Sequence, residues 1–362
     1  MGKNMNNTTQ TQISFRKLYA FGEKLPIDLS LSENPLGCSP KVIMTLKDVS
    51  PKDFFDYPDP DSQDLKNTLS KMFQINSEGI FVANGSEAII KLLPQAILKP
   101  NDEVIIPKLT FPMFEKAVQL VSGKVVFSEM TADFDINLAD IRKRITKSTK
   151  LIFLCNPNNP IGKIIPKDKI LKFVRSSNIL VVVDEANIEF GGDTVIRESQ
   201  DINNLIVLRT FSKGFGLAGL RIGFCVAKPL VVEKLKQISQ PFPVSSIAQK
   251  LAVTALKDKK FMSKTKRFMK QEKEFLTREL ENREFKVIKS EANNLLIKIN
   301  PIFESSTDFV RLLNSKGISI IDGINFDGLG TKFVRISPRL RDTNIQLLKA
   351  IDEILVLLKE RR

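Results

Sequence analysis

Short runs of almost purely apolar residues alternate with amphipathic segments over the first two thirds of the chain. The runs at 150–155, 179–184 and 204–210 are rich in Val, Ile and Leu. Such runs are typical of strands buried on both faces of a parallel sheet, and the segments between them have the period of helices. The chain is therefore expected to belong to the α/β class, with a large domain whose mostly parallel sheet carries helices on both faces.

Beyond about residue 230 the pattern changes to long helices and short strands, which is typical of a smaller α+β domain. A chain of 362 residues is also long for a single hydrophobic core. We therefore expect an N-terminal arm at 1–38 that contributes to the small domain, a large domain at 39–245 and a small C-terminal domain at 246–362. The small domain is then built from both chain ends.

The composition narrows the possible functions. The chain has 55 Lys and Arg against 41 Asp and Glu, and no histidine. The basic residues are spread through helical segments and are not gathered with aromatic residues, so nucleic-acid binding is not expected. Without histidine, His-ligated metal sites are excluded, and acid–base chemistry falls to Lys, carboxylates or Tyr.

Cysteine usage and hydropathy indicate the compartment. Cys38, Cys155 and Cys225 show no metal-binding spacing, so no metal site is expected. No apolar segment follows Met1, and no apolar run approaches the length of a membrane span. We expect a protein of the reducing cytoplasm that does not act at a membrane.

Polar residues stand at the ends of three neighbouring strands. Asn156 and Asp184 each end an expected strand, and Lys213 follows a third. They are about one helix-plus-strand unit apart. Because ligand sites in such sheets lie at the carboxyl ends of the strands, these three residues are expected on one rim.

Lys213 lies in a stretch that can bind an anionic aldehyde. A lysine amine can condense with an aldehyde and can later carry a proton. Ser212 and Arg221 can bind a phosphate group. Residues 85–87 open a helix directly after a strand, and free N–H groups at such a junction also bind phosphate. The alternative is an ordinary solvated lysine in a loop.

Residues 214–219 match the pattern G-x-G-x-x-G. In a dinucleotide-binding fingerprint these glycines open a helix. Here residues 220–227 are rich in β-forming residues and are expected to form a strand. The match is therefore taken as incidental.

With these residues in hand, the chain resembles the class I/II aminotransferases of fold type I, which depend on pyridoxal 5′-phosphate (PLP), and within them the histidinol-phosphate aminotransferase family. The resemblance extends from about Tyr19 to the C-terminal helix. It rests on motifs that occur in the family's order, namely Glu33-Asn34-Pro35, Tyr57-Pro58-Asp59-Pro60, Asn156-Pro157-Asn158-Asn159-Pro160, Asp184-Glu185-Ala186, Ser212-Lys213 and Arg335.

The resemblance implies a role for each motif. Lys213 binds the cofactor's aldehyde covalently and carries the proton, while Asp184 pairs with the ring nitrogen. The other implied cofactor-binding residues are Asn156 at the phenolic oxygen, Asn187 and Phe111 at the ring, Gly85, Ser86, Glu87, Ser212 and Arg221 at the phosphate, and Tyr57 from the neighbouring subunit. A homodimer with shared active sites is therefore implied. Asn187 and Phe111 depart from the family, which usually has an aromatic residue, often Tyr, at the first position and often Tyr at the second.

The implied substrates are a small amine and a 2-oxo acid. Arg335 is expected to bind the substrate's phosphate or carboxylate, with help from Tyr19, Asn34 and Arg339. Arg339 stands where the aminotransferases commonly have Gly and where the related threonine-phosphate decarboxylases often have a basic residue, so a PLP-dependent decarboxylase is one alternative. An amino-acid aminotransferase of the aromatic type is another, and a non-enzymatic anion-binding protein is the third.

Overall fold

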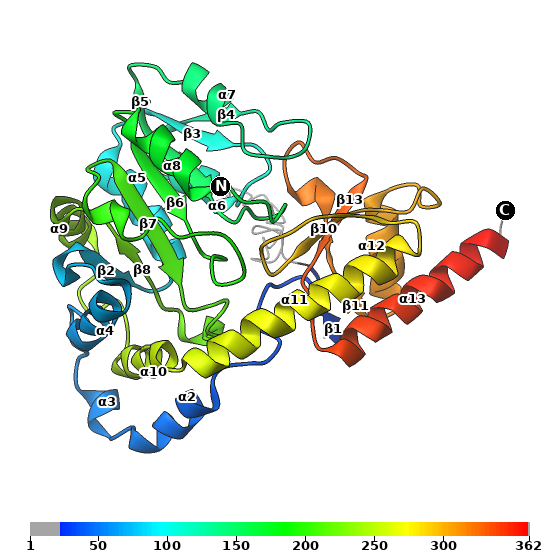
Figure 1. The fold of residues 1–362 in the computed structure, drawn as a ribbon, viewed down its shortest axis with the longest axis horizontal. Helices are drawn as coiled ribbons and strands as arrows, with labels where there is room; N and C mark the ends of the chain where they lie inside the picture. Colours follow the sequence, from blue (N-terminus) through cyan, green and yellow to red (C-terminus); the bar gives the residue numbers. More distant parts are fainter. Residues whose placement is uncertain (1–21, 361–362) are drawn as a thin grey trace, which may run out of the picture.

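A seven-stranded sheet is the largest element of the computed structural model, which describes residues 22–360 (Figure 1). Its strands run in the order β2-β8-β7-β6-β5-β3-β4. They are β2 (Ile80–Ala83), β3 (Glu103–Pro107), β4 (Lys124–Ser128), β5 (Thr149–Cys155), β6 (Leu180–Asp184), β7 (Leu205–Thr210) and β8 (Gly223–Val226). Within this sheet β8 alone runs in the direction opposite to the other strands. The prediction of an α/β fold with a mostly parallel sheet is confirmed.

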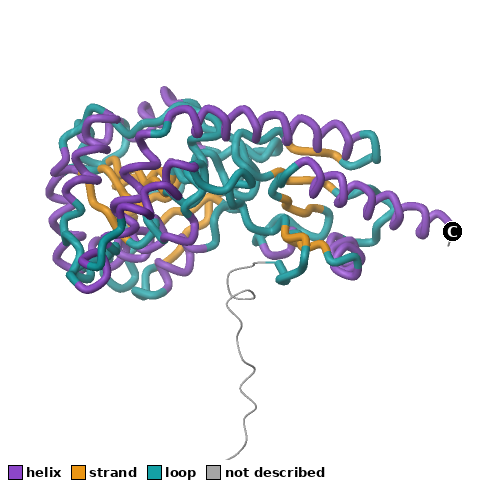
Figure 2. The backbone as a smooth tube through the Cα atoms, turned by 90° about the horizontal axis from the view of Figure 1, so that it is seen from below, coloured by secondary structure: helices purple, strands orange, loops and turns teal. Residues whose placement is uncertain are grey.

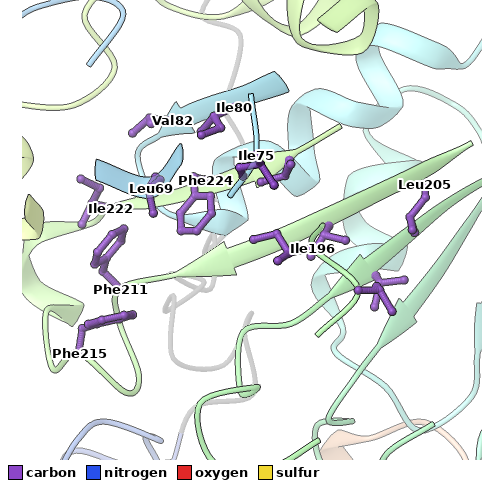
Figure 3. Packing of buried hydrophobic residues seen from close by; sticks show 14 of the residues in the cluster. Leu69, Ile75, Ile80, Val82, Ile196, Leu205, Phe211, Phe215, Ile222 and Phe224 are labelled. Carbon is purple, nitrogen blue, oxygen red and sulfur yellow. The ribbon is translucent and has the colours of Figure 1, made fainter. Parts of the chain in front are cut away.

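Helices cover both faces of this sheet, and the strands of the left half of Figure 2 lie among them. One face packs on α4 (Gln63–Phe73), α7 (Leu138–Lys143), α8 (Lys167–Arg175) and α10 (Ser246–Lys257). The other packs on α5 (Ser86–Ile97), α6 (Met113–Gln119) and α9 (Pro229–Ile238). In β5, Ile152 and Leu154 point to the first face, whereas Leu151 and Phe153 point to the second. Figure 3 shows part of the hydrophobic cluster on the first face of the sheet.

A second, smaller sheet lies beside the first and is antiparallel, in the order β12-β13-β10-β9 (Figure 1). Its strands are β9 (Lys286–Ile288), β10 (Leu295–Lys298), β12 (Ile321–Asp322) and β13 (Phe333–Ile336). The helices around it are α11 (Lys259–Glu281), α12 (Ser306–Ser315) and α13 (Arg341–Glu360). β1 (Ile27–Asp28) pairs with β11 (Ile318–Ser319), so a segment from the start of the chain joins the C-terminal part, as predicted.

The expected domain boundaries stay a prediction. Helix α10 begins at Ser246, yet its buried residues belong to the cluster of the large sheet, as Leu251 and Leu256 show. Buried residues of α11, such as Leu276 and Leu280, belong instead to the cluster of the small sheet. This packing favours a boundary at the start of α11 over one at residue 246.

Ser62 directly precedes α4 but does not cap this helix with its side chain. Ser62 has a left-handed backbone (φ 50°) and makes no capping hydrogen bond. Asp59 replaces it, because its carboxylate accepts the N–H of Gln63 at 2.6 Å. The preceding helices are short, α2 (Pro40–Thr45) and α3 (Lys52–Phe55).

Candidate active site

The carboxyl ends of β5, β6 and β7 lie side by side. Cys155 of β5 is in register with Asp184 of β6, which is in register with Leu208 of β7. Asn156 follows Cys155 directly, and its N–H donates to the carbonyl oxygen of Asp184 at 2.9 Å. Lys213 follows the end of β7 by three residues. The structure therefore brings the three predicted strand-end residues to one rim.

Asp184 is a buried carboxylate with few donors. It is 3% exposed, and its Oδ1 accepts the N–H of Ala186 at 3.0 Å. Burial raises the pKa of Asp184 to about 7, and the charge of Lys213 acts in the opposite direction. A cationic partner placed against this carboxylate would restore its ordinary acidity.

Lys213 is half-buried among four other charged residues. Burial lowers the pKa of Lys213 to about 8, and the positive charge of Arg335 contributes next. Glu33 raises this pKa, whereas Arg221 and Arg339 lower it further. Within residues 22–360 the ammonium group makes no hydrogen bond or ion pair. A fraction of the amine is therefore neutral near physiological pH, and no partner in the described part of the chain holds it.

An anion-binding cradle lies next to Lys213. Gly85 has φ +81°, and a Cβ added there would lie 2.9 Å from Nη2 of Arg221. Helix α5 starts at Ser86 without a side-chain cap, so its first N–H groups are open to a ligand. Nη1 of Arg221 lies 3.4 Å from Oγ of Ser212, which is 9% exposed. These groups therefore lie close together next to the start of α5.

The glycine-rich stretch 214–219 does not open an α-helix. It leads into a 3-10 helix at Ala218–Leu220 and then into β8. The backbone of Gly223 passes so close to α5 that a Cβ there would lie 2.4 Å from the N–H nitrogen of Ser86. Gly223 thus allows a close backbone approach at the cradle, and the stretch 214–219 does not form a dinucleotide-binding turn.

The side chain of Asn156 is hydrogen-bonded to a neighbouring loop. Its Oδ1 accepts the N–H of Ile165 at 2.6 Å, and its Nδ2 donates to the carbonyl oxygen of the same residue at 3.3 Å. Both ends of the fully buried amide are therefore engaged by the backbone of Ile165. Three residues on, Asn159 accepts a hydrogen bond from Nη1 of Arg335 at 2.8 Å, and its own Nδ2 makes no hydrogen bond within the described residues. Sequence reasoning missed Asn159, although it lies in the quoted Asn-Pro-Asn-Asn-Pro motif.

Arg335 reaches the site from the small sheet. It pairs with Leu296 of β10 and Ile321 of β12, and both belong to the cluster that faces the large sheet. Its neighbours Val334 and Ile336 point away, because side chains alternate along a strand. The guanidinium is 8% exposed, donates to Asn159 and to the carbonyl oxygen of Ser30, and keeps Nε without a partner among the described residues. Burial lowers the pKa of Arg335 to about 10.

Arg339 lies at the mouth of the site and is already paired. β13 ends at Ile336, so Arg339 does not continue the strand. Its Nη2 donates to the Glu33 carboxylate at 3.1 Å, and its Nε donates to the carbonyl oxygen of Asp28 at 2.7 Å. Arg339 and Glu33 line a cavity of about 700 Å³ together with Asn34 and Gly216.

The remaining predicted residues have different surroundings. Asn187 is buried with an unpartnered Oδ1, and Phe111 is half-buried with its ring edge-on to Phe114. Asn34 donates both N–H groups, to Gly214 O and to Thr265 Oγ1, so it is a support of the lysine loop and not a free substrate ligand. Glu87 pairs with Lys91 at 2.8 Å, which leaves only its backbone for a ligand. Tyr19 lies outside the described residues.

Among residues 22–360, no group of three or more His, Cys, Asp or Glu side chains could hold a metal ion. In the same part of the chain, every helix is too short or too polar to cross a bilayer.

The residues of the rim fit PLP. Its aldehyde requires a reactive amine, as at Lys213, and its ring nitrogen requires a carboxylate, as at Asp184. Its phosphate requires an open helix N-terminus with a cation, as at Ser86 and Arg221. The unpartnered Oδ1 of Asn187 is one more buried polar atom that a ligand can address. The fold and the site therefore define an enzyme of the PLP-dependent transferase class.

Comparison with known proteins gives the family. Residues 25–351 match the family described as aminotransferase class I and II, so the chain belongs to this family of PLP-dependent aminotransferases. The chain is 35% identical over 342 residues to a histidinol-phosphate aminotransferase of Moorella thermoacetica, covering 92% of this chain and 86% of the relative. It is 33% identical over 335 residues to one of Methanocaldococcus jannaschii, covering 91% and 89%. The crystal structure of a histidinol-phosphate aminotransferase from Clostridium acetobutylicum is similar, with a TM-score of 0.84, 26% identity and coverage of 91% and 98%.

Proposed function

We propose that this aminotransferase acts on a phosphorylated amine and exchanges its amino group with a 2-oxo acid, in the manner of a histidinol-phosphate aminotransferase. The observation that carries the proposal is the convergence of Lys213, Asp184 and the buried Arg335 on one site. After burial, the positive charge of Arg335 has the largest effect on the pKa of Lys213, so the two groups are close enough to interact. The aminotransferases at 33% and 35% identity support the phosphorylated substrate.

The cofactor would be held at both ends. The first N–H groups of α5, at Ser86 and Glu87, would bind its phosphate together with Ser212 and Arg221. Asp184 would pair with the ring nitrogen, and Phe111 would stack on the ring. The phenolic oxygen would accept from Asn187 and from Nδ2 of Asn159, which replaces Asn156 in this role.

The chain's own residues divide the chemistry. When bound, PLP withdraws electrons from the substrate and so makes its α-proton acidic. Lys213 carries that proton, because an amine with a pKa of about 8 is present in both forms near pH 8. Asp184 stabilises positive charge at the ring nitrogen. Asp184 acts in a buried environment, where such electrostatic stabilisation is stronger than in water.

Arg335 would bind the substrate's acidic group. A guanidinium can hold a phosphate or carboxylate with two hydrogen bonds, and Asn159 and Ser30 keep it in place. Arg339 lies further out and is balanced by Glu33 at 3.1 Å. We expect Arg335 to contribute most of the affinity and Arg339 to contribute less.

The test compares histidinol phosphate with histidinol as amino donors, with 2-oxoglutarate as acceptor. The wild type should favour the phosphorylated amine. A charge-assisted hydrogen-bond pair is worth about 1.5–3 kcal/mol, so Arg335→Ala should lower kcat/KM for it by roughly 10- to 150-fold. Arg339→Ala, the matched variant, should lose less than tenfold. Equal use of both amines would point to an ordinary amino-acid aminotransferase, and release of carbon dioxide from an amino-acid substrate would point to a decarboxylase.

We also propose a homodimer whose subunits share their active sites. Large apolar side chains are exposed along α2, α3 and the segments after them, namely Ile43, Met44, Leu46, Phe54 and Phe55. Beside them Tyr57 is 82% exposed and stacks on Phe242, with ring centroids 4.6 Å apart. Exposed apolar side chains on consecutive elements support a protein interface, and the exposed Tyr57 is free to reach a partner.

Subunit complementation tests this sharing. A Lys213→Ala chain mixed with a Tyr57→Ala chain should regain activity, because one site of the heterodimer then has both Lys213 and the partner's Tyr57. The control is a chain carrying both changes mixed with wild type, in which the heterodimer should have no intact site. The activities of the two isolated heterodimers are compared. If the control heterodimer is active and the first heterodimer is not, Tyr57 serves its own subunit.

A cytoplasmic location is proposed as well. The three cysteines are free thiols, and burial raises the pKa of Cys225 to about 12. Unpaired, unreactive thiols are typical of reducing compartments. Cell fractionation with a tagged chain would check it, and a secreted or membrane-bound product would contradict it.

A further inference from the structure

A buried cluster of three charged residues lies behind the site, and the mechanism above does not use it. Arg209 of β7 donates to Oε2 of Glu185 at 3.2 Å and to Oε1 of Glu189 at 2.5 Å. All three residues are at most 6% exposed. Glu185 also accepts from the hydroxyl of Thr194 at 2.5 Å, and the ring of Phe73 lies 5.2 Å from the guanidinium carbon. Glu185, Arg209 and Glu189 are called the buried ion cluster below.

The buried ion cluster is adjacent in sequence to both reactive residues. Glu185 follows Asp184, and its N–H donates to the carbonyl oxygen of Leu208 at 2.9 Å. Arg209 follows Leu208 and precedes Lys213 by four residues. Because side chains alternate, Glu185 and Arg209 point to the opposite face of the sheet from Asp184. The two loops are thus joined on the back of the sheet, while their functional groups meet on the front.

Glu189 provides a direct contact with the lysine loop. A Cβ added at Gly214, the residue after Lys213, would lie 2.8 Å from both Cβ and Cγ of Glu189. The backbone of Gly214 therefore rests on the Glu189 side chain. From the other side, Asn34 donates to the carbonyl oxygen of Gly214 at 2.9 Å. The position of Lys213 depends on these two supports.

We propose that Glu185, Arg209 and Glu189 are positioning residues that lock the loop after Asp184 to the loop that carries Lys213, and so set the separation of the two groups. The proposal rests on the roles proposed above for Asp184 and Lys213. If Lys213 moved away from Asp184, the two residues could no longer bind the aldehyde and the ring nitrogen of the same cofactor.

Local stability alone does not account for the buried ion cluster. Nε of Arg209 and Oε2 of Glu189 have no hydrogen-bond partner among the described residues. The cluster also holds two carboxylates against one guanidinium. Buried ion pairs are often no more stable than apolar side chains of similar volume, so an incompletely satisfied one suggests a purpose other than stability.

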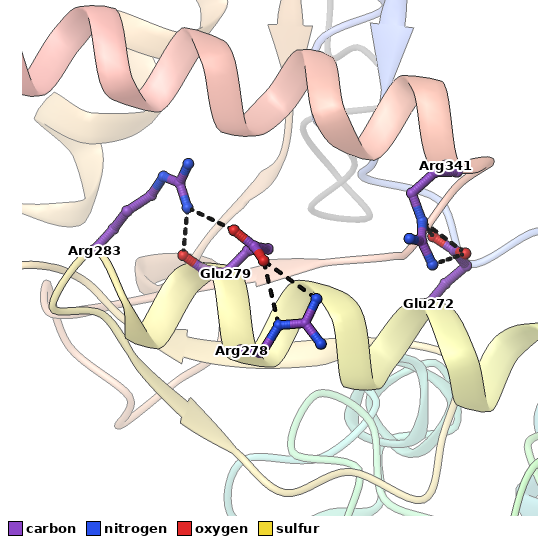
Figure 4. A network of polar contacts seen from close by, with 5 residues as sticks. All are labelled: Glu272, Arg278, Glu279, Arg283 and Arg341. Carbon is purple, nitrogen blue, oxygen red and sulfur yellow. Dashed lines mark hydrogen bonds and ion pairs between the residues drawn. The ribbon is translucent and has the colours of Figure 1, made fainter.

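The molecule has a matched control far from the site. Arg283 also bridges two carboxylates, donating to Asp352 at 2.7 and 2.9 Å and to Glu279 at 3.2 Å. Figure 4 shows Arg283 and Glu279 beside α11. This cluster joins α11 to α13 and does not touch the rim. Arg283→Lys and Glu279→Gln therefore remove the same kinds of contact without a loop to position.

The experiment compares Arg209→Lys and Glu189→Gln with these controls in the full-length chain. Hydrogen exchange, with and without PLP, should become at least tenfold faster in both 185–190 and 211–217 for the two site variants. The PLP dissociation constant should rise by about tenfold, and kcat should fall more than KM rises. The controls should leave exchange in these two segments and PLP affinity unchanged.

Two outcomes separate this proposal from the proposed function. If Arg209→Lys and Glu189→Gln lower only the Tm, while exchange in both segments and PLP affinity match the controls, the buried ion cluster is merely structural and the proposal is wrong. If Lys213→Ala leaves the covalent cofactor label intact, the assignment of the site fails, whereas the exchange result still reports on the loops themselves.

Discussion

The rim of the large sheet and the α11–α13 side of the small sheet both contain a half-buried lysine whose pKa burial lowers to about 8. These are Lys213 and Lys273. Lys273 donates to the carbonyl oxygen of Ser290 at 2.6 Å, whereas Lys213 has no such partner in the described part of the chain. After burial, the influences on the pKa of Lys213 are three arginines and Glu33, whereas those on the pKa of Lys273 are Glu291 and Glu274. A lowered pKa therefore does not by itself identify a catalytic lysine, and the convergence of other functional groups does.

The charged pairs of the two regions differ in the same way. Glu272 binds Arg341 through both of its oxygens, at 2.8 to 3.1 Å, and the Arg341 side chain is 47% exposed (Figure 4). The Glu272 carboxylate is itself buried and also accepts from Nδ2 of Asn344 at 2.8 Å, so its charge is satisfied within the fold. At the rim, Asp184 has one backbone donor and a raised pKa. The rim retains unfavourable charges that a bound cofactor would satisfy.

The largest expected difference between the two regions is that only Lys213 binds the cofactor covalently. Lys213→Ala should abolish cofactor trapped by borohydride and lower turnover by roughly 10³-fold or more, because the proton carrier is lost. Lys273→Met should keep both the label and most of the turnover. Peptide mass spectrometry of the reduced protein locates the label. A label on Lys273, or on any lysine other than Lys213, would overturn the distinction.

A second difference concerns the stability of the cofactor-free protein. The folded pKa of Asp184, about 7, lies above the unfolded value of 3.8, so its contribution to stability is full below about pH 4 and is lost as the pH rises to 7. Asp184→Asn should therefore increase the free energy of unfolding at pH 8 by about 2 kcal/mol, with no gain near pH 3.5, while turnover falls.

Asp258 is the matched carboxylate outside the rim. It caps α11 and accepts the Ser39 hydroxyl at 2.5 Å, which lowers the pKa of Asp258. Asp258→Asn should therefore decrease stability at pH 8, because the favoured carboxylate is lost. Urea unfolding measures both variants, and the same sign for both would refute the comparison.

The smallest expected effect is a shift in pH dependence. Only the neutral amine of Lys213 attacks an aldehyde, so the rate of PLP capture by the cofactor-free chain should rise with pH, with a midpoint near 8. Arg335→Gln removes a positive charge and should move the midpoint upward by roughly half a unit. Arg341→Gln, which changes a distant charge, should leave it in place. A midpoint above 10 in the wild type would mean that Lys213 is not in this electrostatic environment.

The sequence by itself determined the parts that depend on neighbouring residues. Apolar runs predicted the strands at the rim, and a strand end determines where Asp184 lies. The strand at 220–227, expected from its β-forming residues, excluded a dinucleotide fold, and β8 lies there. These features follow from periodicity and from chain direction in a parallel sheet, so they can be predicted from the sequence.

Only the tertiary structure decided which side chains meet. Asn156 binds Ile165, nine residues away, but Asn159 meets Arg335 across 176 residues and Arg339 meets Glu33 across 306. The neighbouring asparagines look alike in sequence, and a local pattern cannot tell an amide that holds its own loop from one that faces a ligand. That choice depends on how the small sheet packs against the large one, because hydrogen-bond partners are set by distances between elements and not by spacing along the chain.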